Sequence, residues 1–177
     1  GAIFSFYGNK IITTGEGGMV TTNDKSLYDK AKELRDHAMS KEKRYWHTRI
    51  GYNYRMTNLQ AALGLAQLSR IDNIIKRKNQ IFKLYKEYLE PIEELEVNYT
   101  NPDYKNVYWM ICVNYRNWDE NSRDHFIVKL KEQGIDTRPY FYPISDMPMY
   151  KNNAVEYTSV CHDIYKQGVN LPSSVHL

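Results

Sequence analysis

Side chains alternate between two sides at the start of the chain, as they do in a β-strand. The alternation covers residues 2–7 and places two phenylalanines on the same side. Gly8 and Asn9 then interrupt it, as turn residues do. Residues 18–22 (GMVTT) are rich in β-prone types and predict a second strand. The pattern therefore predicts two short strands separated by a loop that contains glycine.

A helical period follows the second strand. Apolar side chains recur every three to four residues across 26–37, and Ser26 can cap the helix that this spacing predicts. Residues 38–56 show no such period and predict a long loop of polar and aromatic residues. Loops of this length in compact domains are usually functional or disordered, and the GYNY segment favours an ordered loop that makes contacts.

The clearest helical pattern begins at Thr57, which forms a capping-box motif with Gln60. The pattern runs to Pro91 and so predicts a single helix about 50 Å long. A helix of that length exceeds one layer of a small domain and would connect two parts of the chain. Its apolar positions are Leu59, Leu63, Ala66, Ile71, Ile75, Phe82, Tyr85 and Leu89.

Beyond Pro91 the pattern predicts a small α+β unit. Residues 107–115 are strongly β-prone, and residues 122–133 have the period and flanking signals of a helix. The prolines within residues 137–143 keep that segment extended. Residues 155–166 predict a last helix.

The composition is that of a globular protein, with 42% hydrophobic and 25% charged residues in 177. The net charge of +3 comes from well-mixed acids and bases, so we expect no nucleic-acid partner. No run approaches the roughly 20 apolar residues of a membrane helix, and the first residues do not resemble a signal peptide. Cys112 and Cys161 have no CxxC neighbour, which argues against a zinc site and leaves a disulfide open; a reducing cytoplasm is the default expectation.

Lys10 lies in an unusual place, in the turn after the first predicted strand. By composition alone it is an ordinary solvated lysine. A lysine held in a tight turn is partly desolvated, which favours the neutral amine, and a neutral amine can form a Schiff base with an aldehyde. The glycines at positions 15, 17 and 18 do not match the phosphate-binding loop of nucleotide triphosphatases, so that class is excluded.

Three segments, in this order, resemble nucleotide-sugar aminotransferases. They are FSFYGNKIITTGEGGMV (residues 4–20), GYNYRMTNLQAALGLAQL (residues 51–68) and TRPYFYP (residues 137–143). The resemblance is to the perosamine-synthase-like, DegT/StrS type, whose members are fold-type-I enzymes that use pyridoxal 5'-phosphate. It implies an α/β fold of the aspartate-aminotransferase type. Residues 1–70 would then be the C-terminal part of the large cofactor-binding domain, and residues 71–177 a connecting helix and a small α+β domain.

The resemblance also implies roles for individual residues. Lys10 matches the lysine that binds the cofactor covalently, and Ser5 matches a serine that binds its phosphate. Asn53 matches an asparagine that reaches the phosphate of the neighbouring subunit, which implies a homodimer with a shared active site. Without the resemblance, each of these has an ordinary reading as a turn, packing or surface residue. Three further residues match segments that approach the sugar nucleotide: Arg55, Arg138 and Tyr142.

The implied reaction is transfer of an amino group, with glutamate as the donor, to a keto group of a nucleotide-linked deoxysugar. Such a reaction belongs to aminosugar and polysaccharide biosynthesis in the cytoplasm. Relatives with histidine at the position of Lys10 deoxygenate sugars, so Lys10 favours transamination over a dehydratase. A non-catalytic domain of the same fold is the other alternative. The first residues read as the middle of a strand, and the family's cofactor-ring ligands are not found in the chain, so we expect an incomplete large domain.

Overall fold

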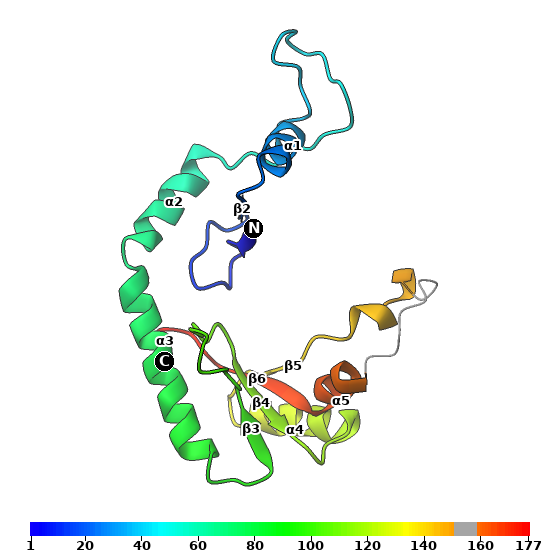
Figure 1. Ribbon diagram of the computed structural model, residues 1–177. Helices are drawn as coiled ribbons and strands as arrows, with labels where there is room; N and C mark the ends of the chain where they lie inside the picture. Colours follow the sequence, from blue (N-terminus) through cyan, green and yellow to red (C-terminus); the bar gives the residue numbers. More distant parts are fainter. Residues whose placement is uncertain (151–158) are drawn as a thin grey trace. The chain divides into compact units, whose positions relative to one another are not determined.

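The computed structural model describes residues 1–150 and 159–177 (Figure 1). The chain divides into two compact units. The N-terminal unit is Gly1–Asp72, and the C-terminal unit is Asn73–Leu177. Each is described by itself below.

The N-terminal unit begins with an antiparallel hairpin, as the sequence pattern predicts. Strand β1 (Ala2–Ser5) pairs with β2 (Gly18–Thr21), so that Ser5 lies opposite Gly18. Gly18 is required there because a Cβ atom at this position would lie 2.9 Å from the carbonyl oxygen of Phe4. The first strand is shorter than predicted, and the chain beyond Ser5 enters the loop that carries Lys10.

Helix α1 (Lys25–Arg35) follows the hairpin, but the predicted cap is wrong. Asp24, and not Ser26, caps the helix, because its carboxylate accepts the backbone N–H groups of Ser26 and Leu27 at 2.8 and 3.1 Å. An aspartate at this position also interacts favourably with the positive end of the helix dipole. Residues 38–56 contain no helix or strand, as predicted; isolated bridges join Asp36 to Asn53 and Met39 to His47.

The single long helix predicted from Thr57 to Pro91 is wrong. It is two helices, α2 (Asn58–Leu68) and α3 (Ile71–Leu89). The capping box of Thr57 and Gln60 is present as predicted. Helix α2 ends where the hydroxyl of Ser69 donates to Ala66 O at 2.9 Å and the N–H of Arg70 donates to Gln67 O at 3.0 Å, a tightened last turn. The predicted apolar period also breaks here, since Ala66 and Ile71 are five positions apart and not three or four.

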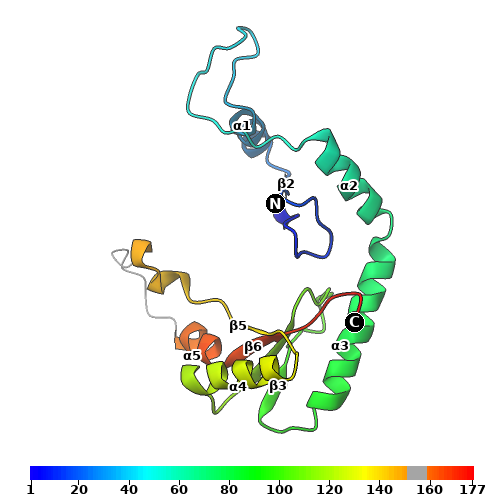
Figure 2. The ribbon, with the colours of Figure 1, turned by 180° about the vertical axis from the view of Figure 1, so that it is seen from behind.

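The C-terminal unit contains a four-stranded antiparallel sheet with the order β3-β4-β6-β5 (Figures 1 and 2). The sequence predicts β4 but misses β3 and β6, which are three and four residues long. The predicted strand 107–115 begins only at Ile111, because Tyr108 adopts a positive φ of 48°. The elements are β3 (Leu95–Val97), β4 (Ile111–Tyr115), α4 (Glu120–Glu132), β5 (Arg138–Pro139), the 3-10 turns Ile144–Asp146 and Pro148–Tyr150, α5 (Ser159–Gln167) and β6 (Gly168–Leu171).

One predicted helix start is wrong in this unit. The helix across 122–133 is predicted to have Ser122 as its cap, but α4 begins at Glu120 and is capped by Asp119, whose carboxylate accepts the N–H of Ser122 at 2.8 Å. Helix α5 begins within the described residues at Ser159, so the predicted residues 155–158 of that helix lie outside them. Helix α5 ends at Gln167, directly before Gly168, which begins β6.

The core of the C-terminal unit lies between α3 and β4. Ile81 and Phe82 of α3 are buried with Ile111 of β4. The ring of Phe82 stacks on that of Tyr108, with centroids 3.7 Å apart. Lys78, one turn before Phe82, is also buried, and its ammonium group donates to Trp109 O at 3.1 Å and to Ser173 O. Burial lowers the pKa of this lysine, and the carbonyl partners compensate for the lost water.

Tyr140 packs closely on the sheet. A Cβ atom at Gly168 would lie 2.2 Å from the Tyr140 ring, so only glycine fits beneath it. Burial raises the pKa of the Tyr140 hydroxyl, and the neighbouring Cys112 thiol raises it further. The folded protein therefore keeps this hydroxyl protonated to higher pH than an exposed tyrosine would be.

Phe82→Ala is expected to lower the free energy of unfolding by about 3–4 kcal/mol, because it removes a stacked ring and leaves a cavity. Urea unfolding monitored by circular dichroism measures the loss. Leu84→Ala on the same helix is the matched control, since Leu84 is half exposed, and it should cost less than about 1 kcal/mol. Equal losses in the two variants would contradict the placement of the core.

Tyr140→Phe is expected to reduce the decrease in the free energy of unfolding that occurs as the pH rises above about 10. A tyrosine in the unfolded chain releases its proton near pH 10, whereas Tyr140 in the folded protein holds it longer, so stability falls as the pH rises above about 10. The variant should reduce this slope by up to about 1.4 kcal/mol per pH unit. Tyr99→Phe, at a side chain that is 87% exposed, should leave the slope unchanged. Urea unfolding between pH 8 and about 11 tests this, and an unaltered slope in Tyr140→Phe would refute it.

Candidate active site

Lys10 lies in a tight turn between the two strands of the hairpin. Its backbone N–H donates to Tyr7 O at 3.0 Å, which closes the turn. Two backbone hydrogen bonds join the two ends of the loop: the N–H of Phe6 donates to Gly17 O, and the N–H of Thr14 donates to Phe6 O, both at 2.9 Å. The side chain of Lys10 is half-buried. The backbone of this lysine is therefore held, as expected for a residue that must present its amine in one place.

Two threonines shape the return arm of this loop. The Thr13 hydroxyl donates to Phe6 O at 2.9 Å and accepts the Gly15 N–H at 2.9 Å. The Thr14 hydroxyl donates to Glu16 O at 2.7 Å. Gly17 has a φ of 144°, and a Cβ atom there would lie 2.7 Å from the Thr14 hydroxyl oxygen. The threonine pair and this glycine therefore specify the path of the chain beyond Lys10.

Ser5 ends the strand that leads into the same loop. Its hydroxyl oxygen accepts the Tyr7 N–H at 3.5 Å, and the side chain is exposed. The structure thus places Ser5 and Lys10 on one short segment whose turn begins at Tyr7. The segment thus carries a hydroxyl and an amine, the two groups that the resemblance implies for the phosphate and the aldehyde of the cofactor.

Asn53 and Arg55 lie on the loop after α1. Asn53 is bridged to Asp36 at the end of α1. The N–H of Tyr54 donates to Arg35 O at 3.0 Å, and Arg55 forms an ion pair with Asp36 at 3.5 Å. These contacts fix the backbone of the segment against α1, while the side chains of Asn53 and Arg55 are exposed. The loop is therefore held at this end by contacts with α1 and its C-cap, Asp36.

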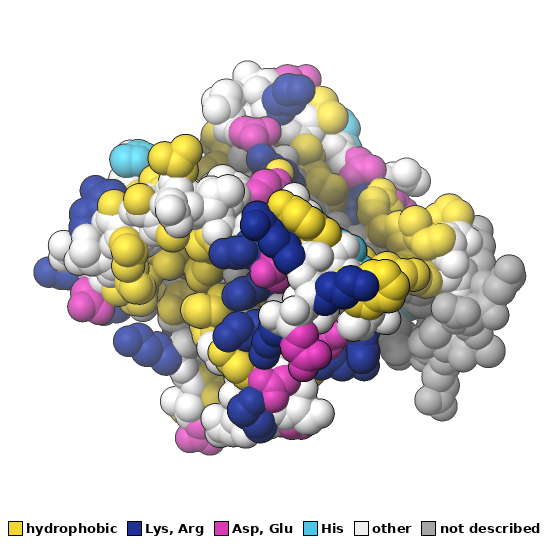
Figure 3. Space-filling model, turned by 90° about the horizontal axis from the view of Figure 1, so that it is seen from above, with side chains coloured by type: hydrophobic (Ala, Val, Ile, Leu, Met, Phe, Trp, Pro, Cys, Tyr) yellow, Lys and Arg dark blue, Asp and Glu magenta, His cyan; other side chains and the backbone are white. Residues whose placement is uncertain are grey.

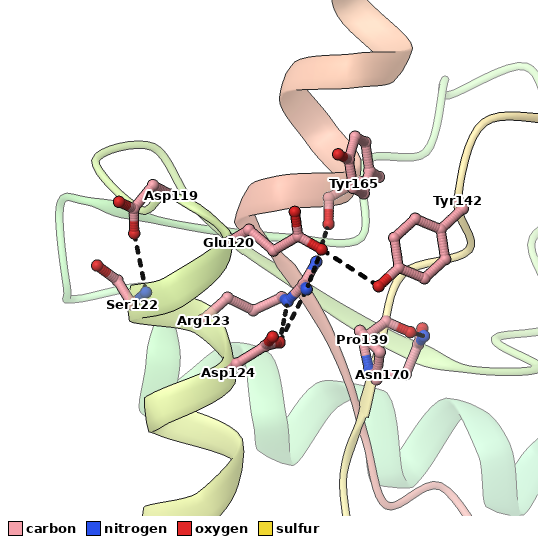
Figure 4. Close-up of polar contacts among 9 residues, drawn as sticks. All are labelled: Asp119, Glu120, Ser122, Arg123, Asp124, Pro139, Tyr142, Tyr165 and Asn170. Atoms are coloured by element: carbon pink, nitrogen blue, oxygen red, sulfur yellow. Dashed lines mark hydrogen bonds and ion pairs between the residues drawn. The ribbon is translucent and has the colours of Figure 1, made fainter. Parts of the chain in front are cut away.

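Tyr142 and Arg138 belong to the C-terminal unit. Arg138 is exposed on β5, where it pairs with Asn170 of β6. The hydroxyl of Tyr142 donates to Glu120 Oε1 at 3.2 Å, and its ring lies 5.3 Å from that of Tyr165 (Figure 4). The Tyr142 side chain is therefore oriented by α4 and α5, although its segment has no regular structure.

The carboxylate that orients Tyr142 is itself held by a buried arginine. The side chain of Arg123 is fully buried and donates to Glu120 at 3.3 Å, to Asp124 at 2.8 Å and to Tyr165 O at 2.6 Å (Figure 4). Burial opposes the charge on Arg123, but the hydrogen bond and ion pair with Asp124 and the charge of Glu120 outweigh it, so the pKa is raised. Sequence reasoning missed this cluster. The available signal is an arginine flanked by acids at i−3 and i+1 on a predicted helix.

The two cysteines do not form a disulfide. Cys112 and Cys161 are both free thiols and both line a cavity of about 500 Å³ in the C-terminal unit. Burial raises the pKa of Cys112, which keeps it protonated.

Across residues 1–150 and 159–177, no three metal-ligating side chains come together. No helix in the same part of the chain is both long and apolar enough to cross a membrane.

A family model matches the whole chain, residues 1–177, and it is described as the DegT/DnrJ/EryC1/StrS aminotransferase family. The chain belongs to this family. The resemblance that the three sequence segments indicate is thereby confirmed. GDP-perosamine synthases are among the relatives of this family member: that of Escherichia coli O157:H7 is 44% identical over 172 residues, and that of Caulobacter vibrioides is 41% identical over 180.

These matches cover 96% and 99% of this family member but only 45% and 48% of the relatives. The chain therefore spans just under half of the length of each. Among solved structures, PseC of Helicobacter pylori, an aminotransferase involved in pseudoaminic acid biosynthesis, matches with a TM-score of 0.86 and 26% identity. DesV of S. venezuelae matches with a TM-score of 0.84 and 28% identity. Both matches cover 99% of this chain; they cover 48% of the PseC chain and 47% of the DesV chain. These matches confirm the predicted fold-type-I, aspartate-aminotransferase-like class.

Arg123→Met is expected to destabilise the protein by about 3 kcal/mol, because it leaves the Tyr165 carbonyl and two carboxylates without their shared partner. Urea unfolding measures the loss. Arg116→Met is the matched control, because Arg116 is an exposed arginine paired with Glu96 and such pairs contribute less than about 1 kcal/mol. If the control lost as much stability as Arg123→Met, the buried arginine would not organise this region.

Proposed function

We propose that this chain is the lysine-bearing part of a pyridoxal-phosphate-dependent aminotransferase. The reaction moves an amino group from an amino acid, glutamate by family resemblance, to a keto carbon of a nucleotide-linked deoxysugar. The observation that carries the proposal is Lys10, held in a closed turn beside Ser5 in a chain of an aminotransferase family. The names of the GDP-perosamine synthases support a nucleotide-sugar substrate.

The residues present suit the cofactor. Lys10 would bind its aldehyde through Nζ with loss of water, and the Ser5 hydroxyl would bind its phosphate. When bound, the cofactor supplies an aldehyde that takes the amino group from the donor and an amine form that gives it to the keto carbon, so no external oxidant is consumed. Once released by an incoming amine, Lys10 Nζ would serve as the base that removes a proton and the acid that returns it.

Three residues are proposed to contact the sugar nucleotide: Arg55, Arg138 and Tyr142. The arginines are exposed and carry the charge that a diphosphate needs. Tyr142 is oriented through Glu120, so its ring can form one fixed side of a sugar site. Arg55 belongs to the N-terminal unit, and Arg138 and Tyr142 belong to the C-terminal unit.

The proposed assembly is a homodimer with shared active sites, in the cytoplasm, in which Asn53 reaches the cofactor phosphate of the partner. Large apolar side chains are plentiful on the surface (Figure 3). On the loop around Asn53 they include Tyr45, Ile50 and Tyr54, of which Ile50 is 84% exposed. Exposed apolar side chains in one ordered loop favour a surface that another subunit covers.

Lys10→Ala is expected to abolish amino transfer, with a loss of about 10³-fold or more, because it removes both the covalent attachment and the proton carrier. Borohydride treatment of the wild-type protein should fix reduced cofactor on the peptide that contains Lys10, and mass spectrometry locates it. Lys30→Ala is the control, since Lys30 is an exposed lysine of α1.

The proposal fails if the wild-type protein, incubated with pyridoxal phosphate, has no visible absorption band and no labelled Lys10. That result would favour a non-catalytic domain of the same fold. Product analysis separates the remaining alternative, because a dehydratase would release a deoxygenated sugar and no amino sugar.

A further inference from the structure

Helix α2 contacts the lysine loop through a side that carries two glutamines and a glycine. Gln60, Gly64 and Gln67 are spaced four and three residues apart, so they lie on one side of the helix. They are half-buried, whereas Leu59 is 85% exposed and Leu65 is 67% exposed. Leu59 and Leu65 are therefore not on the buried side of this helix.

Gln67 binds the backbone of a single residue of that loop twice. Its Oε1 accepts the Thr13 N–H at 3.1 Å, and its Nε2 donates to Thr13 O at 2.7 Å. One amide group thus satisfies both polar groups of Thr13, as a neighbouring strand would. The reverse orientation of the amide would break both bonds, so the assignment of its nitrogen and oxygen follows from the partners.

Two more positions extend this contact along the helix. Gln60 Nε2 donates to Glu16 O at 3.1 Å, while its Oε1 accepts the Thr57 N–H at 2.9 Å. At Gly64, between the two glutamines, a Cβ atom would lie 3.0 Å from the Thr14 methyl group. The return arm of the lysine loop is therefore seated along two turns of α2, with glycine where the approach is closest.

We propose that Gln67 is a positioning residue for Lys10. This inference rests on the proposed function and deepens it, because it names the group that holds the reactive lysine in place. Thr13 follows Lys10 by three residues, and the turn around Lys10 is closed by one backbone hydrogen bond. Without the amide of Gln67, the arm that leaves the turn would shift, and small displacements of a reacting group are costly in rate.

A neutral amide suits this position. It supplies one donor and one acceptor and places no charge near the amine of Lys10, whereas glutamate would supply acceptors only. A carboxylate could still accept the Thr13 N–H but would repel Thr13 O. Gln67→Glu therefore breaks half of the contact at neutral pH, and protonation restores the donor near pH 4 or below, about the ordinary carboxyl pKa.

The first test compares wild type with Gln67→Met, which keeps the side-chain length and removes both hydrogen bonds. Hydrogen exchange of residues 11–16 is measured without cofactor and should become about tenfold faster, the factor expected for the loss of a net hydrogen bond. With cofactor added, the pH at which the visible band of the lysine-bound form titrates should shift. Gln80→Met, on an exposed position of α3, should change neither measurement.

The second test uses Gln67→Glu and needs no activity. Exchange of residues 11–16 should exceed that of wild type at pH 7 and return to the wild-type rate at about pH 4. An unshifted titration of the visible band in Gln67→Met overturns the inference, even where exchange is faster, because Gln67 would then be structural only. Absence of acid rescue in Gln67→Glu also overturns it. If wild type forms no adduct at Lys10, the proposed function fails instead, and the exchange data alone report whether the loop is seated on α2.

Discussion

The N-terminal unit depends on the pairing of one side-chain amide with one backbone segment, Gln67 with Thr13. These residues are 54 positions apart, so the contact joins the hairpin to α2. A two-stranded hairpin is marginally stable by itself, and β1 and β2 are exposed along their whole length. Hydrogen bonds to α2 therefore add to those within the loop itself, which join Phe6 to Gly17 and Thr14 to Phe6. This explains why a chain with several exposed leucines on α2 still orders its lysine loop.

The C-terminal unit is held together by an apolar core, in contrast to the hydrogen-bonded N-terminal unit. It has an apolar core of Ile81, Phe82 and Ile111, and it buries one arginine completely. A buried charge is costly unless it is paired, and Arg123 is paired with two acids and a carbonyl group. Because the pairing directs the carboxylate of Glu120 toward Tyr142, the charge orients a surface tyrosine through one intermediate. In each unit, a polar side chain that the sequence did not single out contacts a candidate residue or its loop. These side chains are Gln67, which binds the lysine loop, and Glu120, which binds Tyr142.

Local signals in the sequence predict the hairpin, the helices and the capping box of Thr57, because each depends on residues close together in the chain. The same reasoning fails at Ser69, where the helix is broken by two hydrogen bonds in its last turn. It also misses the short strands β3 and β6, which form only because β4 lies beside them. The roles of Lys10 and Ser5 are predictions from the resemblance; in the structure, Ser5 ends β1 and Lys10 lies in the turn that follows. Gln67 and Glu120 are not predicted, since their roles come from contacts distant in sequence.

The two kinds of surface on α2 have different consequences for the chain. The glutamines and Gly64 satisfy polar backbone groups of the lysine loop, so each is constrained in length and chemistry by a specific partner. The leucines of α2 have no such constraint within the described residues and remain largely exposed. Exposed apolar side chains on an ordered helix are stabilised when another surface covers them. In the proposed assembly, the glutamines and Gly64 would hold the lysine loop, and the exposed leucines would be available for contact with another subunit. A change in the leucines would then act on assembly, whereas a change in Gln67 would act on the lysine loop directly.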